Sequence, residues 1–95
     1  MDLTVDGRRV FAGTGGKPLT RDRPLVVLLH GAGMDHTVWV LQARFLAYHG
    51  FSVLAVDMPG HGRSEGSALT TIEAMAGWVA KVVAASGFDK AALVG

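Results

Sequence analysis

The sequence predicts an α/β fold, with an amino-terminal β-hairpin followed by a mostly parallel sheet with flanking helices. Three apolar runs typical of buried strands alternate with two segments of helical periodicity, and such alternation indicates a parallel sheet with crossover helices. A tight-turn signal between two short alternating segments precedes the first of these runs. With 95 residues, of which 49% are hydrophobic, the chain has the size of one small domain with an apolar core.

The amino-terminal hairpin is predicted from Asp6-Gly7, which lies between the short segments 3–5 and 9–12. An Asp-Gly pair adopts the positive φ angles that a two-residue hairpin turn requires. The glycine-rich residues 13–18 then indicate a loop. It leads to Leu25-Val26-Val27-Leu28-Leu29, whose unbroken apolar character is expected of a strand buried on both faces of a parallel sheet.

A first helix is predicted from about residue 37 to residue 49, ending at Gly50. Its periodicity places four large apolar residues on one side, namely Val38, Leu41, Phe45 and Tyr48. The next strand is expected at 51–56. A glycine-rich turn, 57–64, follows it.

The second helix has the clearest start and stop signals. Thr70 and Glu73 match a capping box, and Gly87 fits the residue after the last turn. An apolar stripe of period 3.6 follows the cap, comprising Ile72, Met75, Ala76, Val79, Val82 and Val83. Residues 90–94 then begin a further strand.

Composition excludes several classes of function. The formal net charge is +1 and the arginines are scattered among acidic residues, so nucleic acid and anionic membranes are poor partners. The absence of cysteine excludes disulfides, thiolate metal sites and a cysteine nucleophile within these residues. No run approaches the roughly 20 apolar residues of a membrane span, and the amino terminus lacks the pattern of a signal peptide. A cytoplasmic location is therefore expected.

Two loops of unusual composition follow the first two buried strands, and functional loops of an open α/β sheet lie at the carboxyl ends of its strands. They are His30-Gly31-Ala32-Gly33-Met34 and Asp57-Met58-Pro59-Gly60-His61-Gly62-Arg63-Ser64, and the last strand runs into Ala92-Leu93-Val94-Gly95. With Trp39, these motifs resemble the α/β-hydrolase family in order and spacing, over the whole chain. The resemblance implies that residues 1–95 form the amino-terminal portion of an incomplete hydrolase core domain, ending just before the nucleophile elbow.

The resemblance implies that the first loop stabilises an oxyanion. Acyl transfer passes through a tetrahedral oxyanion, and preorganised N–H donors aimed at it lower the barrier. In the family one donor is the backbone amide of the residue after His-Gly, which here is Ala32. Gly31 and Gly33 suit a backbone that approaches substrate closely, while His30 and Met34 shape the same loop. The expected partner is a small-molecule substrate, and neither a cofactor nor a metal is implied.

Other polar residues of the loops are interpreted as structural. The family order of nucleophile, acid and then histidine places the catalytic histidine late in the chain, so His30 is interpreted as a loop organiser. His61 lies between two glycines and is interpreted as structural or as lining the mouth of the site. Asp57 is expected to accept amide protons from its own turn. His36 and His49 show no partner pattern.

A dinucleotide-binding fold is the competing interpretation. Gly31-Ala32-Gly33 after one strand and Asp57 at the end of the next imitate the glycine fingerprint and its ribose-binding acid. Against this interpretation, His36 occupies the third glycine position, where close helix packing requires a small residue. The predicted hairpin and the 59–64 turn also have no role in that scheme.

The nucleophile is an inference from the strand that leads to Gly95, since an apolar strand running into glycine begins the approach to a G-x-S-x-G elbow. Ser, Asp and Cys all remain open as nucleophiles. Neither Ser64 nor Ser86 lies in such a motif. We expect the complete protein to hydrolyse an ester, lactone, amide or related bond, and the 95-residue chain alone to be inactive and poorly soluble.

Overall fold

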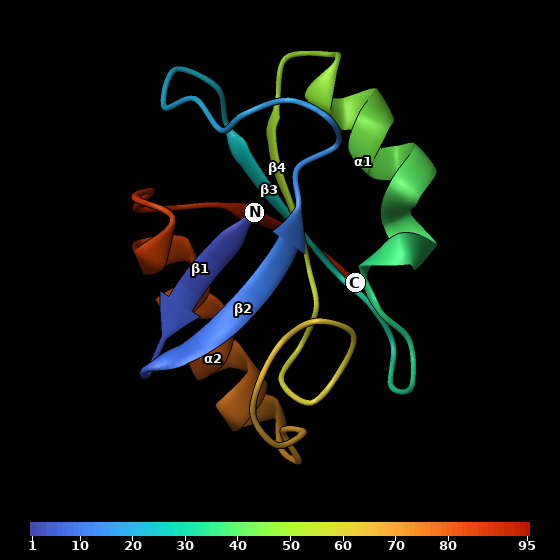
Figure 1. Ribbon diagram of the computed structural model, residues 1–95. Coiled ribbons are helices and arrows are strands. Elements are labelled where there is room, and N and C mark those ends of the chain that lie inside the picture. Colours follow the sequence, from blue (N-terminus) through green and yellow to red (C-terminus); the bar gives the residue numbers. More distant parts are fainter.

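In the computed structural model, which describes residues 1–95, five strands form one sheet in the order β1-β2-β4-β3-β5 (Figure 1). The strands are β1 (Asp2–Val5), β2 (Arg8–Gly13), β3 (Leu25–Leu29), β4 (Ser52–Val56) and β5 (Ala92–Val94). Strand β3 pairs in parallel with β4 on one side and with β5 on the other. The hairpin β1–β2 joins the sheet through an antiparallel contact of β2 with β4. The predicted α/β fold and its mostly parallel sheet are confirmed.

The hairpin turn forms at the predicted pair. Asp6 and Gly7 have φ angles of 52° and 75°, which identifies the tight turn whose twist matches paired strands. Lys81 reaches the turn from the second helix, with its Nζ 2.8 Å from Asp6 Oδ2. Both side chains are exposed, so we assign this ion pair little stabilisation.

Side chains of β3 and β4 alternate between two apolar layers on opposite faces of the sheet. Val27 and Leu54 pack into the layer beneath helix α2 (Ile72–Ala85), together with the hairpin. Val26 and Val53 pack into the other layer, beneath helix α1 (Val40–Ala47). Figure 1 shows the two helices on opposite sides of the strands. This burial on both faces explains why each strand is a continuous apolar run.

The first helix differs from its prediction in both extent and orientation. A 3₁₀ turn, η1 (His36–Trp39), precedes α1, and the apolar side identified from the sequence is exposed, with Leu41 77% and Phe45 60% accessible. Ala43 and Ala47 face the sheet instead. Small side chains allow the helix to lie close to the sheet and to the loop that contains Gly15. This approach is so close that a Cβ on Gly15 would overlap with the Ala43 carbonyl.

The second helix begins one residue later than its capping prediction. Thr71 is the N-cap, and its side-chain oxygen accepts a hydrogen bond of 3.0 Å from the Ala74 amide, so the Thr70–Glu73 capping box is wrong. Val79 and Val82 are buried as expected, whereas the first half of the predicted stripe is exposed. Gly87 ends the helix with φ of 88°, as predicted.

Strand β5 forms one edge of the sheet, and its three residues are exposed. This order contradicts the dinucleotide-binding alternative, in which the third parallel strand lies beyond the second and not beside the first. Here the antiparallel β2 occupies that place, next to β4. Neither helix is long and apolar enough to cross a lipid bilayer.

Candidate active site

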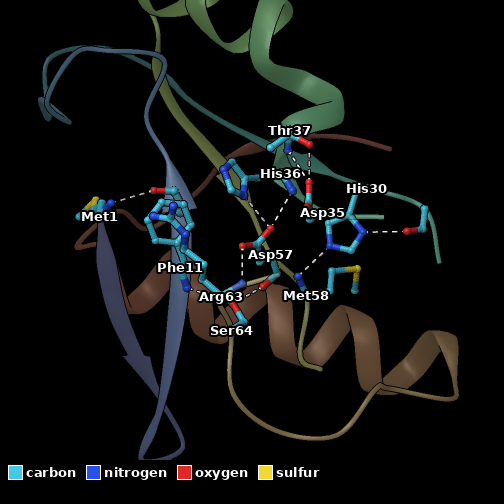
Figure 2. A network of polar contacts seen from close by, with 12 residues as sticks. Met1, Phe11, His30, Asp35, His36, Thr37, Asp57, Met58, Arg63 and Ser64 are labelled. Carbon is cyan, nitrogen blue, oxygen red and sulfur yellow. Dashed lines mark hydrogen bonds and ion pairs between the residues drawn. The ribbon is translucent and has the colours of Figure 1, made fainter. Parts of the chain in front are cut away.

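The two loops that follow β3 and β4 meet at the carboxyl-end rim of the sheet (Figure 2). We call residues 30–37 and 57–64 the rim loops. The parallel pairing of β3 with β4 brings Leu29 opposite Val56, so the residues after each strand start side by side. The position agrees with the general rule that ligands of open α/β sheets bind beyond the carboxyl ends of their strands.

Asp57 is the polar centre of the rim loops. It is fully buried, and its Oδ1 accepts hydrogen bonds from the His36 amide at 2.7 Å and from His36 Nδ1 at 2.9 Å. Its Oδ2 accepts the Arg63 amide at 2.9 Å. The predicted role as an acceptor within its own turn is confirmed. With both oxygens occupied inside the fold, this carboxylate is not exposed to bind a ribose, as the alternative interpretation required.

Gly62 and Ser64 close the second rim loop around Asp57. A Cβ at Gly62 would overlap with the Asp57 carboxylate, so only glycine fits there without a shift of the turn. Ser64 Oγ donates to the Asp57 carbonyl at 2.5 Å and accepts the Phe11 amide at 3.0 Å. Ser64 therefore ties the loop to strand β2, which is a structural role.

Two histidines link the rim loops to one another. His30 is buried; its Nε2 accepts the Met58 amide at 2.9 Å, and its Nδ1 lies 2.7 Å from the Gly31 carbonyl oxygen. In the reverse direction, His61 Nε2 accepts the Gly33 amide at 3.2 Å, and its Nδ1 lies 3.0 Å from the Pro59 carbonyl oxygen. Because a carbonyl oxygen only accepts, both rings are assigned as neutral with the hydrogen on Nδ1.

The first rim loop presents the amide of Ala32 to solvent. Met34 donates to the Gly31 carbonyl at 3.2 Å, and Gly33 has φ of 76°, which together indicate a type II turn over 31–34. Ala32 is exposed, and its N–H takes part in none of the hydrogen bonds within the chain. A trans peptide directs its C=O and N–H to opposite sides. The bond from His30 to the Gly31 oxygen therefore directs the Ala32 N–H away from His30.

An open hollow of about 600 Å³ lies beside this turn. It is lined by Gly33, Met34, Asp35, Thr37, Val38, Gly60, His61 and Gly62. Of the predicted site residues, Gly33 and Met34 line this hollow, whereas His30, Gly31 and Ala32 do not; residues 60–62 of the second rim loop form part of its wall. Met34 contributes its exposed side chain to the wall.

Asp35 is the N-cap of the 3₁₀ turn η1, and its contacts do not indicate a metal centre. Its Oδ1 accepts hydrogen bonds from the Thr37 side chain and the Thr37 amide, and these bonds lower the pKa of the Asp35 carboxyl below its ordinary value. Asp35, His36 and Asp57 lie close enough for a shared cation. Asp57 Oδ1 already accepts hydrogen bonds from the backbone amide and the Nδ1 of His36. These contacts explain the grouping without an ion.

The sequence missed His36 as a partner of Asp57, since no motif relates the two positions. A usable signal exists: a carboxylate buried at a strand end requires donors, and the loop after the neighbouring parallel strand is the nearest source. His49, just beyond the end of α1, hydrogen-bonds to the Phe45 carbonyl at 2.6 Å and not to a residue of the rim loops. Trp39 packs against the layer beneath α1.

The sheet order, the rim loops and their turn geometry define an α/β protein whose polar loops meet at the carboxyl ends of its parallel strands. Residues 24–95 match the family described as alpha/beta hydrolase fold. The chain belongs to the α/β-hydrolase family.

Individual relatives carry several chemistries. The chain is 40% identical over 93 residues to the dihydrolipoyllysine-residue acetyltransferase component of the acetoin cleaving system of Cupriavidus necator, covering 96% of this chain and 23% of that protein. It is 49% identical over 61 residues to a pimeloyl-[acyl-carrier protein] methyl ester esterase of Sodalis glossinidius, covering 64% of this chain and 23% of that protein. The chain therefore spans about a quarter of the length of these curated relatives.

Solved structures agree with the fold. A bacterial membrane phospholipase A superimposes with a TM-score of 0.84 at 30% identity, over 98% of this chain and 29% of that chain. An epoxide hydrolase from an endophytic Streptomyces superimposes with a TM-score of 0.76 at 32% identity, over 100% of this chain and 28% of that chain. Both matches include the strands that carry the rim loops.

Proposed function

We propose that this chain supplies the oxyanion-binding loop of a hydrolase that cleaves an ester, lactone, amide or related bond by nucleophilic acyl transfer. The observation that carries the proposal is the Ala32 amide, which is exposed at the carboxyl end of β3 and free of internal partners. An N–H donor held in that state needs no reorganisation when negative charge develops on a substrate oxygen.

The surrounding loop preorganises this donor. Gly31 accepts from both His30 and Met34, so the peptide that carries the Ala32 N–H is fixed on its carbonyl side. The hollow next to the turn gives a small substrate access. Removal of one oxyanion donor typically lowers kcat by about 100- to 1000-fold, which is the contribution we assign to Ala32 in the complete enzyme.

Acyl transfer to an acceptor other than water is a second candidate. It is favoured by the acetyltransferase relative, whose match extends over 96% of the chain. Both reactions need the same oxyanion donor, so Ala32 has one role in either case. The nucleophile stays open between Ser, Asp and Cys, and an aspartate would indicate epoxide or dehalogenation chemistry. A cytoplasmic location and a small-molecule substrate are part of the same proposal.

A chimera tests the proposal. A segment of this chain that includes the rim loops replaces its counterpart in the Sodalis glossinidius esterase, of which the match spans 23%, and hydrolysis of a methyl ester is measured with Ala32, Ala32→Ser or Ala32→Pro. Proline is favoured at the second position of a type II turn, so Ala32→Pro removes the N–H and leaves the turn intact. We expect kcat to fall about 100- to 1000-fold in Ala32→Pro and to change little in Ala32→Ser. Equal activity of all three chimeras contradicts the proposal.

A further inference from the structure

We propose that His61 positions the oxyanion loop by holding the Ala32–Gly33 peptide, and that protonation of its ring flips this peptide. The proposal rests on the proposed function only for its effect on catalysis. The flip itself is a property of the 31–34 turn and is measurable in the 95-residue chain.

The first step of the argument is the reciprocal arrangement of the two imidazoles. Each ring belongs to one rim loop and accepts a hydrogen bond from a backbone amide of the other rim loop. The centroids of the two rings lie 5.0 Å apart. His30 fixes the peptide before Ala32 through the Gly31 oxygen, and His61 fixes the peptide after it through the Gly33 amide. Both backbone torsions of Ala32 are thus held by imidazole contacts, although alanine has no polar side chain.

The second step concerns the turn. Type I and type II turns differ mainly by a flip of the central peptide, which reverses ψ at the second residue and φ at the third. The central peptide of the 31–34 turn joins Ala32 to Gly33, and its N–H donates to His61 Nε2. Glycine at the third position tolerates both forms, since its φ is free to be positive or negative. His61 therefore selects between two accessible states.

The third step is the charge state of the ring. A neutral His61 with hydrogen on Nδ1 accepts from Gly33 and favours the observed turn. A protonated ring has a donor on both nitrogens and no acceptor, so it repels the Gly33 N–H. The flipped peptide offers the Ala32 carbonyl to that new donor. Acid therefore turns the Ala32 carbonyl toward His61 in place of the Gly33 N–H, which changes the conformation of the loop beside the hollow.

The groups around His61 fit this assignment. His30 lies beside it in the first rim loop, and Asp35 lines the same hollow. On its own loop, Asp57 is occupied by His36 and the Arg63 amide, while the Arg63 guanidinium lies over the Phe11 ring at 4.8 Å.

Nuclear magnetic resonance of the ¹⁵N,¹³C-labelled chain tests the proposal at about pH 8 and pH 5, on either side of the ordinary histidine pKa of about 6.5. At the higher pH we expect a coupling across the N–H···N bond from Gly33 to His61 and a positive φ at Gly33. At the lower pH we expect loss of that coupling and a negative φ, following the titration of the His61 ring nitrogens. Unchanged amide signals from β3 exclude unfolding.

Two variants sharpen the test. The side chain of His61→Gln reaches a similar position without a charge, so we expect Gly33 to be the same at both pH values. Gly33→Ala penalises the positive φ where its Cβ meets no neighbour within 4 Å, so we expect the flipped turn already at pH 8. The proposal is overturned if Gly33 responds to pH equally in wild type and His61→Gln, or stays unchanged while His61 titrates.

Titration with benzenesulfonate, which carries one negative charge at both pH values, separates this proposal from the proposed function. We expect the anion to shift the Ala32 amide signal at pH 8 and the strength of this binding to change several-fold at pH 5. If the anion never affects Ala32 while Gly33 follows His61, the oxyanion role fails and the flip stands. If the anion shifts Ala32 equally at both pH values while Gly33 ignores His61, the flip fails and the oxyanion role stands.

Discussion

The rim loops and the β5 edge are the two regions of the molecule that differ most in how far their side chains find partners within the chain. In the rim loops, polar side chains find partners within the chain, and Asp57 alone accepts three hydrogen bonds on its carboxylate. Along the β5 edge, apolar groups lack partners: Leu93 is 55% exposed, and a groove of about 470 Å³ lies between β5 and α1. The rim loops are therefore expected to be sensitive to single substitutions, and the edge to be insensitive.

Asp57→Ala is expected to have the largest effect. The substitution leaves the His36 side chain and two amides without their buried acceptor, and a donor left unpaired in this way typically costs about 1–3 kcal/mol. Urea denaturation followed by circular dichroism measures the loss. Asp57→Asn retains one carbonyl oxygen and is expected to lose less. A loss below about 1 kcal/mol in Asp57→Ala would show that the rim network contributes little to stability.

Gly62→Ala is the second test, because its new Cβ would overlap with the Asp57 carboxylate. Crowding of this kind typically costs about 1–3 kcal/mol. Gly7→Ala is the matched control, since Gly7 also has a positive φ, of 75°, but open space around the new Cβ. We expect Gly62→Ala to have the lower free energy of unfolding of the two. Equal values would mean that backbone strain alone accounts for both.

Leu41→Lys tests the other region. Leu41 is 77% exposed on the outer side of α1, so the free energy of unfolding should change by less than about 0.5 kcal/mol. Self-association, measured by sedimentation velocity, should decrease because the substitution places a charge in an exposed apolar groove. Ala43→Lys, on the buried side of the same helix, should be strongly destabilising. If Leu41→Lys were strongly destabilising, the result would support the orientation of α1 that was predicted from the sequence.

The smallest effect is expected at Asp35. Hydrogen bonds from Thr37 hold the pKa of the Asp35 carboxyl below its ordinary value, so the carboxylate stabilises the folded chain above that value. This contribution is lost as the pH falls through the lowered pKa. Carboxyl ¹³C titration by nuclear magnetic resonance measures the shift directly. In Thr37→Val, which removes the hydroxyl donor, the pKa of Asp35 should return toward its ordinary value.

Much of the fold could be predicted because its signals are local. The Asp6-Gly7 turn, the two apolar runs of β3 and β4 and the Gly87 helix stop each depend on a few neighbouring residues. The strand order could not be predicted from local signals, since pairing of β3 with β5 is a contact between residues distant in sequence. Local pattern alone left the dinucleotide-binding order open.

The orientation of α1 could not be predicted, for a physical reason. Hydrophobic periodicity favours the side with Leu41 and Phe45, whereas the space beneath the helix accepts only small side chains such as Ala43. The fit of small side chains against the sheet and Gly15 determines which side of α1 is buried. This fit cannot be inferred from the residues of the helix alone. The same limit applies to His36, whose pairing with Asp57 depends on two loops meeting in space.

The measurement that most directly tests the account is amide hydrogen exchange at Ala32, Gly33 and Met34 in the ¹⁵N-labelled chain at neutral pH. Gly33 and Met34 donate to His61 and Gly31, whereas the Ala32 amide has no partner. We predict exchange at Ala32 close to the rate of an unprotected amide, and measurably slower exchange at the other two. Protection at Ala32 would show that its N–H is engaged within the fold, which would contradict the proposed oxyanion role.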